Sequence, residues 1–212
     1  MNQKKDLYCI SGLGADYRVF HRLENHFNLK HLHWVNPEKN ESLKSYAKRL
    51  SKKIDTNNTS IYLIGVSFGG IIAQEIAEII PVKKLILVSS FYSSNNVPLI
   101  FKLLVRLKLN HLFFPQLICH FSFFNNFSFG VTEKEDKKLL KSIIKDTPRD
   151  FFIWATNSLV KWTSHHYQSS FISIHGTKDH VVPFYKNCDL TLVGAGHFGI
   201  FTNSQNIIQL LQ

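Results

Sequence analysis

Short apolar runs that alternate with helical segments are the feature that most constrains the fold of this chain. Six runs have the length and the Ile, Val, Leu and Tyr content of strands; they span residues 7–10, 31–35, 61–65, 84–89, 171–175 and 190–193. Two helices are predicted between them, one opened by Ser42 and one across residues 69–80 that Pro81 ends. Apolar strands alternating with helices predict an α/β fold with a mostly parallel six-stranded sheet and helices on both faces.

The segment of about 91–166 breaks this alternation, because it is helix-like, rich in Phe and Lys, and lies between the fourth strand and the fifth. We interpret it as a helical lid inserted into a single domain of residues 1–212. The length of the chain, its 44% of hydrophobic residues and its 19% of charged residues suit one globular domain. In such a sheet, ligands bind beyond the carboxyl ends of the strands, so functional residues are expected in the loops that follow them.

The motif GVSFGG at residues 65–70 lies where the third strand is predicted to end and a helix to begin. Its serine, Ser67, is either a catalytic nucleophile or part of a plain strand-to-helix turn. A nucleophile there occupies a strained backbone conformation, and side chains at Gly65 and Gly69 would collide where strand and helix converge. This setting is the one that a G-x-S-x-G nucleophile elbow requires, and it favours the catalytic interpretation.

A serine nucleophile needs a base within hydrogen-bonding reach and a third group that orients the base. His197 is the candidate base, because GAGHFG places it on a glycine-rich loop after the last strand, although a lone histidine is more often a surface or core residue. Asp179 of HGTKDHVVP is the candidate acid, because it follows the fifth strand; Asp189 competes but lies at the opposite end of its strand. The order Ser67, Asp179, His197 suits a Ser-His-Asp triad on this kind of sheet.

The loop SGLGAD after the first strand is a candidate oxyanion hole. Gly12 belongs to its glycine-rich bend, from which the backbone N–H of Leu13 can point to the same place as the N–H of Phe68. Two such donors would stabilise the negative oxygen of a tetrahedral intermediate. The alternative interpretation of GLG is a plain turn or a weak phosphate loop, and the missing G-x-G-x-x-G spacing argues against dinucleotide binding.

Together, SGLGAD, GVSFGG, HGTKDHVVP and GAGHF resemble the α/β-hydrolase superfamily over nearly the whole chain, and most of all small bacterial members. The resemblance implies a minimal fold without the amino-terminal strand pair, with Ser11 where many members carry the His of an HG motif. It also implies hydrolysis of an ester, thioester or related acyl bond through a covalent acyl-serine, with no metal or organic cofactor. A serine at the elbow excludes the dehalogenase and epoxide-hydrolase branches, which place Asp there.

The substrate is expected to be a small acyl ester, and the stretch 112–129 bears on its choice. That stretch has seven phenylalanines and no charged residue, so its rings either line an acyl pocket or pack the lid onto the sheet. Its polar residues and Pro115 argue against insertion into a membrane. A methyl esterase for pimeloyl-type chains on an acidic carrier protein is one alternative, and a non-catalytic ligand-binding member or a lyase is another.

Charge and cysteine content bear on partners and compartment. The formal net charge of +10 suits an acidic partner, but the lysines are spread along the chain without a nucleic-acid-binding signature. Cys9, Cys119 and Cys188 are far apart and show no disulfide or zinc-ligand pattern. The first residues reach Gly and Asp before an apolar core of signal-peptide length can form, so a cytoplasmic location is predicted.

Overall fold

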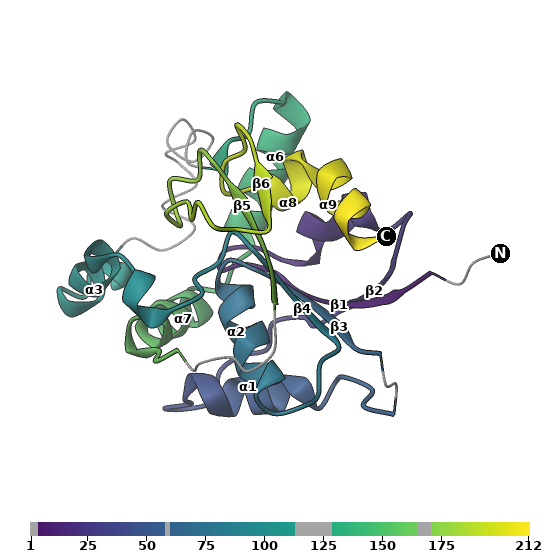
Figure 1. Ribbon diagram of the computed structural model, residues 1–212. Coiled ribbons are helices and arrows are strands. Elements are labelled where there is room, and N and C mark those ends of the chain that lie inside the picture. Colours follow the sequence, from purple (N-terminus) through teal and green to yellow (C-terminus); the bar gives the residue numbers. More distant parts are fainter. Residues whose placement is uncertain (1–3, 58–59, 113–128, 165–170) are drawn as a thin grey trace.

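The protein is described here by a computed structural model that covers residues 4–57, 60–112, 129–164 and 171–212. Its centre is a six-stranded sheet in the order β2-β1-β3-β4-β5-β6, and all five pairings are parallel (Figure 1). The strands are β1 (Asp6–Ile10), β2 (Asn28–His31), β3 (Tyr62–Val66), β4 (Lys84–Val88), β5 (Phe171–Gly176) and β6 (Leu190–Leu192). The predicted α/β architecture with a parallel six-stranded sheet is therefore confirmed.

Helices cover both faces of the sheet, as predicted (Figure 1). One face packs against η1 (Tyr17–Leu23), α6 (Lys134–Lys145), α8 (Gly199–Thr202) and α9 (Ser204–Leu211). The other packs against α1 (Leu43–Ser51), α2 (Phe68–Ala77) and α7 (Arg149–Lys161). The remaining described helical elements are η2 (Ser94–Asn96), α3 (Leu99–Arg106), which lies against α7, and η3 (Leu109–His111).

Successive side chains of a strand point to opposite faces, and this alternation feeds two separate cores. In β1, Leu7 and Cys9 enter the core beneath α6 and α9, whereas Tyr8 and Ile10 enter the core beneath α1 and α2. All four side chains are buried. A strand that is buried on both faces must be apolar throughout, which is why the runs that mark the strands are nearly continuous rather than alternating.

The second strand lies earlier in the chain than predicted. The run 31–35 was expected to form it, but β2 ends at His31 and shares only that residue with the run. β2 is an edge strand, so its length is set by its single partner, β1, which ends at Ile10. The last bond between them joins the Leu32 N–H to the Cys9 carbonyl at 2.9 Å. The apolar residues beyond it pack into the core without being paired.

The two predicted helices are present. Ser42 caps α1, and its hydroxyl oxygen accepts from the Ser45 N–H at 3.1 Å. The helix expected at 69–80 is α2, which begins at Phe68 and ends at Ala77, before Pro81. Its last turn is loosened rather than lost, because the Ile80 N–H still donates to the Ile76 carbonyl at 3.0 Å.

The segment between β4 and β5, interpreted as a lid, supplies core helices as well. Leu140 and Ile143 of α6 are buried on one face of the sheet, and Phe151 and Ala155 of α7 are buried on the other. Most of the Phe-rich stretch 112–129 lies outside the described residues. The lid therefore stays a prediction, and it concerns the part of the segment that precedes α6.

The order of the strands places the loops after β1 and β3 side by side. β1 lies between β2 and β3, so the chain extends the sheet first toward one edge and then toward the other. A crevice forms at the carboxyl ends of the two strands where this direction changes, and ligands of open α/β sheets bind there. The loop that holds Gly12 and the turn that holds Ser67 both open onto this point.

We expect the central strands to carry most of the stability of the fold. Ile64 on β3 is fully buried, so Ile64→Ala should lower the free energy of unfolding by about 2–5 kcal/mol. Leu99 on α3 is 79% exposed, so Leu99→Ala should change it by no more than about 0.5 kcal/mol. Urea unfolding with unchanged m-values measures both. Equal losses in the two variants would contradict the assignment of the core.

Candidate active site

Ser67 is the single residue between β3 and α2, and its backbone is strained. Its backbone has φ 52° and ψ −123°, in the region that non-glycine residues avoid. Holding a residue there costs about 1–3 kcal/mol, so the surroundings must enforce it. They do so through two hydrogen bonds: the Ser67 N–H donates to the Val88 carbonyl at 2.9 Å, and the Ser90 hydroxyl donates to the Ser67 carbonyl at 2.7 Å.

The glycines of the turn are required by contact with other backbone. A Cβ at Gly65 would lie 2.5 Å from the Gly69 carbonyl oxygen, where strand and helix converge. A Cβ at Gly69 would overlap the carbonyls of Ile10 and Ser11 at the end of β1. The predicted steric reason for these glycines is thus confirmed, and it extends to the neighbouring strand.

Asp179 and His197 are joined although they come from different loops. His197 follows β6 and donates its Nδ1–H to Asp179 Oδ2 at 2.8 Å. Both residues are buried. The two loops are also connected by backbone, because the Lys178 N–H donates to the Ala195 carbonyl at 2.9 Å. Asp189, the competing acid, instead accepts from the amide and hydroxyl of Ser173 and is not part of this cluster.

A second histidine, which sequence reasoning missed, also contacts Asp179. His175 at the end of β5 is fully buried, and its Nε2 lies 3.1 Å from the Val182 carbonyl oxygen and 3.3 Å from Asp179 Oδ2. The other carboxylate oxygen, Oδ1, accepts from the N–H groups of Val181 and Val182, each at 2.9 Å. The sequence signal that could have revealed it is a titratable residue at the end of a strand that is predicted to be buried in the sheet.

The surroundings of Asp179 keep its carboxyl ionised. Burial raises its pKa, but the attraction of His197 and the hydrogen bonds from the two histidines and Val182 outweigh burial. The pKa of Asp179 is therefore held well below its usual range. An ionised carboxylate is what an orienting acid requires, because it must accept a hydrogen bond from the Nδ1–H of the base.

A small apolar cavity brings Ser67 and His197 together. Its volume is about 190 Å³, and both side chains line it, although the structure contains no hydrogen bond between them. Leu13, Gly14 and Phe68 form the wall beside Ser67. The other lining residues are Ile71, Phe91, Phe101, Phe129, Ile144, Phe152, Thr156, Leu159, Val181 and Val182. Of the Phe-rich stretch 112–129, Phe129 lines this cavity and contacts the His197 ring edge to face.

Comparison with known proteins identifies the fold. No protein-family model and no curated protein matches the sequence. Among solved structures, an esterase (EaEST) from Exiguobacterium antarcticum has a TM-score of 0.77 at 16% identity, over 100% of this chain and 91% of that chain. The hydrolase olei00960 from Oleispira antarctica has 0.75 at 14%, over 99% and 90%, and MenH from S. aureus has 0.69 at 14%, over 100% and 93%. The chain has the α/β-hydrolase fold.

In this α/β-hydrolase fold, the loop after β1 is fastened by Ser11, which stands where many α/β hydrolases carry the His of an HG motif. The Ser11 hydroxyl donates to the Ala15 carbonyl at 3.0 Å, and the Ala15 N–H donates to the Gly12 carbonyl at 3.1 Å. Gly12 lies directly against the elbow, because a Cβ there would be 3.2 Å from Ser67 Cβ. No acceptor among the described residues receives the N–H of Leu13 or of Phe68. Both residues line the cavity, so their unpaired amides are candidates for the oxyanion hole.

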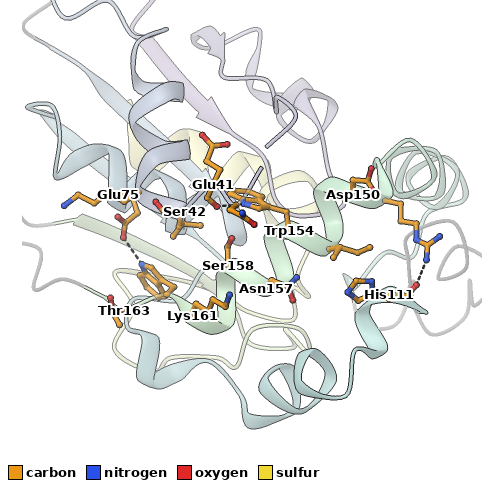
Figure 2. A pocket seen from close by; sticks show the side chains of 16 residues that line it. Glu41, Ser42, Glu75, His111, Asp150, Trp154, Asn157, Ser158, Lys161 and Thr163 are labelled. Carbon is orange, nitrogen blue, oxygen red and sulfur yellow. Dashed lines mark hydrogen bonds between the residues drawn. The ribbon is translucent and has the colours of Figure 1, made fainter. Parts of the chain in front are cut away.

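A larger hollow than this cavity lies elsewhere on the described surface. It is a groove of about 990 Å³ between the start of α1 and α7, and it carries charges of both signs (Figure 2). Within it the indole N–H of Trp162 donates to Glu75 Oε1 at 2.9 Å. No residue of the predicted site lines this groove, so its size does not make it the better candidate. The described residues also contain no group of metal-ligating side chains and no helix long and apolar enough to cross a membrane.

The depressed pKa of Asp179 has a measurable consequence for acid stability. The unfolded chain takes up a proton near the ordinary carboxyl pKa of about 3.9, before the native state does. The stabilisation by this group is therefore present at higher pH and is lost as the pH falls. We expect the free energy of unfolding of the wild type to fall more steeply between about pH 5 and pH 3 than that of Asp179→Asn. Asp55→Asn, at an exposed turn, is the control for losing one carboxylate.

Proposed function

We propose that the chain is a serine hydrolase that cleaves a carboxylic ester or thioester through an acyl-serine intermediate. The observation that carries the proposal is the 2.8 Å hydrogen bond from His197 to a buried, ionised Asp179, at the wall of the cavity that Ser67 lines. A buried, ionised carboxylate can orient an imidazole. When that imidazole lines the same cavity as a serine on a strained turn, the arrangement is one that activates a hydroxyl as a nucleophile.

In the proposed reaction, each step has a named group. His197 donates a hydrogen bond from Nδ1–H to Asp179, which leaves Nε2 free to take the Ser67 proton while Oγ attacks the acyl carbon. The N–H groups of Leu13 and Phe68 would hold the oxyanion of the tetrahedral intermediate. As the intermediate collapses, His197 returns the proton to the leaving alcohol or thiol. Water then hydrolyses the acyl-serine by the same route, and every step uses this chain and water alone.

The nature of the cavity supports an apolar acyl group. Of its lining residues, Ser67, Thr156 and His197 carry polar side chains, and the others are aliphatic, aromatic or glycine. A small acyl chain would bury apolar surface there without displacing a charge. That EaEST is an esterase of the same fold agrees with this proposal. An acidic carrier protein as partner stays a prediction that suits the net charge of +10, and a cytoplasmic location also stays a prediction.

A fluorophosphonate probe and a p-nitrophenyl ester series from acetate to decanoate test the proposed nucleophile. We expect the probe to label the wild type and not Ser67→Ala, and kcat to fall by about 10³-fold or more in that variant. Ser158→Ala, which removes a serine from the groove of Figure 2, should retain both labelling and activity. An unlabelled wild type without esterase activity would instead favour a ligand-binding or lyase function.

The position of the acyl chain is tested by narrowing the cavity. Leu159 lines it and is buried, so Leu159→Phe should reduce the room for a long chain. We expect kcat/KM for decanoate to fall about tenfold or more relative to acetate. Ile153→Phe adds the same ring to the groove of Figure 2 and should leave the chain-length profile unchanged. An equal loss for all chain lengths in Leu159→Phe would show that the acyl chain lies elsewhere.

A further inference from the structure

His175 is the most deeply buried titratable side chain near the candidate triad, and the proposed reaction does not use it. Its side chain has no exposed surface and does not line the cavity. It contacts the same oxygen of Asp179 as His197 does, but only His197 reaches the cavity. A buried imidazole whose polar atoms all face polar partners must satisfy them in a definite arrangement, because an unpaired buried group is costly.

One partner of His175 shows which ring nitrogen carries a hydrogen. The carbonyl of Val182 can only accept, so the nitrogen 3.1 Å away, Nε2, must carry the proton. The same N–H points toward Asp179 Oδ2 at 3.3 Å. The second nitrogen, Nδ1, lies 3.5 Å from the Tyr92 hydroxyl oxygen. The contact with the Val182 carbonyl therefore assigns a hydrogen to Nε2.

Val182 connects His175 to Asp179 by a second route. Its N–H donates to Asp179 Oδ1, and its carbonyl accepts from His175 Nε2. One imidazole thus holds both the carboxylate and the loop that carries it. The ring itself is held by neighbouring aromatic rings, with centroids 5.4 Å away at Tyr185 and 5.9 Å away at Phe184. A side chain that orients another side chain must itself be held rigidly, and these ring contacts hold His175.

We propose that His175 is a positioning residue for the triad, which acts through Asp179 by fixing the direction of its carboxylate and sharing its negative charge. This inference rests on the proposed function for its effect on catalysis. Oδ2 is the oxygen that accepts from His197, so a second N–H on the same atom weakens its hold on a proton of that imidazole. Removing His175 therefore leaves a freer and more strongly attracting carboxylate.

The expected signature is a change in pH dependence together with a loss of rate. The groups that face His175 are Asp179, Tyr92 and Tyr185, with His197 beyond the carboxylate. Burial raises the pKa of Tyr185 to about 12 and that of Tyr92 further, so both hydroxyls stay neutral in the assay range. Without the N–H of His175, the Asp179 carboxylate attracts a positive charge on His197 more strongly, so protonation of His197 is favoured. The acidic limb of kcat/KM should then move to higher pH.

Three variants test this role with a p-nitrophenyl ester. We expect His175→Leu to lower kcat about 10–100-fold, the range seen when orienting partners are removed, with KM little changed and the acidic limb at higher pH. His175→Gln keeps an N–H at the same reach and should recover most of the rate and the limb. Tyr92→Phe removes the hydroxyl beside Nδ1 but keeps the ring, and it should behave like the wild type. Thermal unfolding of each variant measures the accompanying loss of stability.

A readout that does not depend on turnover separates this inference from the proposed function. The proton shared by His197 and Asp179 gives a far-downfield NMR signal, which Asp179→Asn must abolish. We expect this signal to weaken or shift in His175→Leu and to be kept in His175→Gln. Should the wild type hydrolyse no ester and take no probe, the proposed function fails, while this signal still decides the role of His175.

Two results would overturn the inference. One is an unchanged rate, acidic limb and NMR signal in His175→Leu. The other is a loss of rate and stability without any movement of the limb or the signal, and without recovery in His175→Gln, which is what a purely structural role produces. If His175→Leu does not fold, His175→Asn replaces it, because its amide is too short to reach Val182 and Asp179 together. Equal behaviour of the Asn and Gln variants would then overturn the inference.

Discussion

Close packing of backbone on backbone, where the β3–α2 turn meets the end of β1, is the constraint on which the rest of the structure depends. Gly69 lies against the carbonyls of Ile10 and Ser11, and Gly65 lies against the first turn of α2. Any side chain there would push the helix away from the sheet. Because the contact is made at the carboxyl end of β1, it also fixes the distance between the loop with Leu13 and the nucleophile candidate. The strain at Ser67 is sustained by this packing.

A second constraint is the buried charge on Asp179. An ionised carboxylate away from water is stable only when its oxygens are occupied by donors, and four N–H groups converge on this one. Two of the donors are backbone amides of its own loop, and two are imidazoles from β5 and from the loop after β6. The charge therefore holds these segments together, and the same contacts that stabilise it aim it at His197. The same hydrogen bonds therefore stabilise the loop and orient His197.

Features that depend on neighbouring residues in the chain were predicted from the sequence, whereas features that depend on contacts with distant segments were missed. The G-x-S-x-G spacing and the helix cap at Ser42 are local, and the structure has the strained turn and the cap where they were expected. The start and end of β2 depend on where β1 ends, so the apolar run 31–35 was a poor guide to the strand. His175 was missed because its partners, Val182 and Asp179, come from a loop whose path no pattern in the strand FISIH indicates.

The arrangement separates charge from the space in which an acyl group would lie. The polar groups that support the imidazole stand behind it, whereas the cavity in front is lined by apolar side chains apart from Ser67, Thr156 and His197. An apolar chain can enter without removing water from a charge, which would be costly. In the proposed reaction, a positive charge on His197 would lie 2.8 Å from Asp179, in surroundings that screen it weakly. The larger groove in Figure 2 places its charges on its walls and lacks this separation, so chemical convergence rather than volume distinguishes the candidate site.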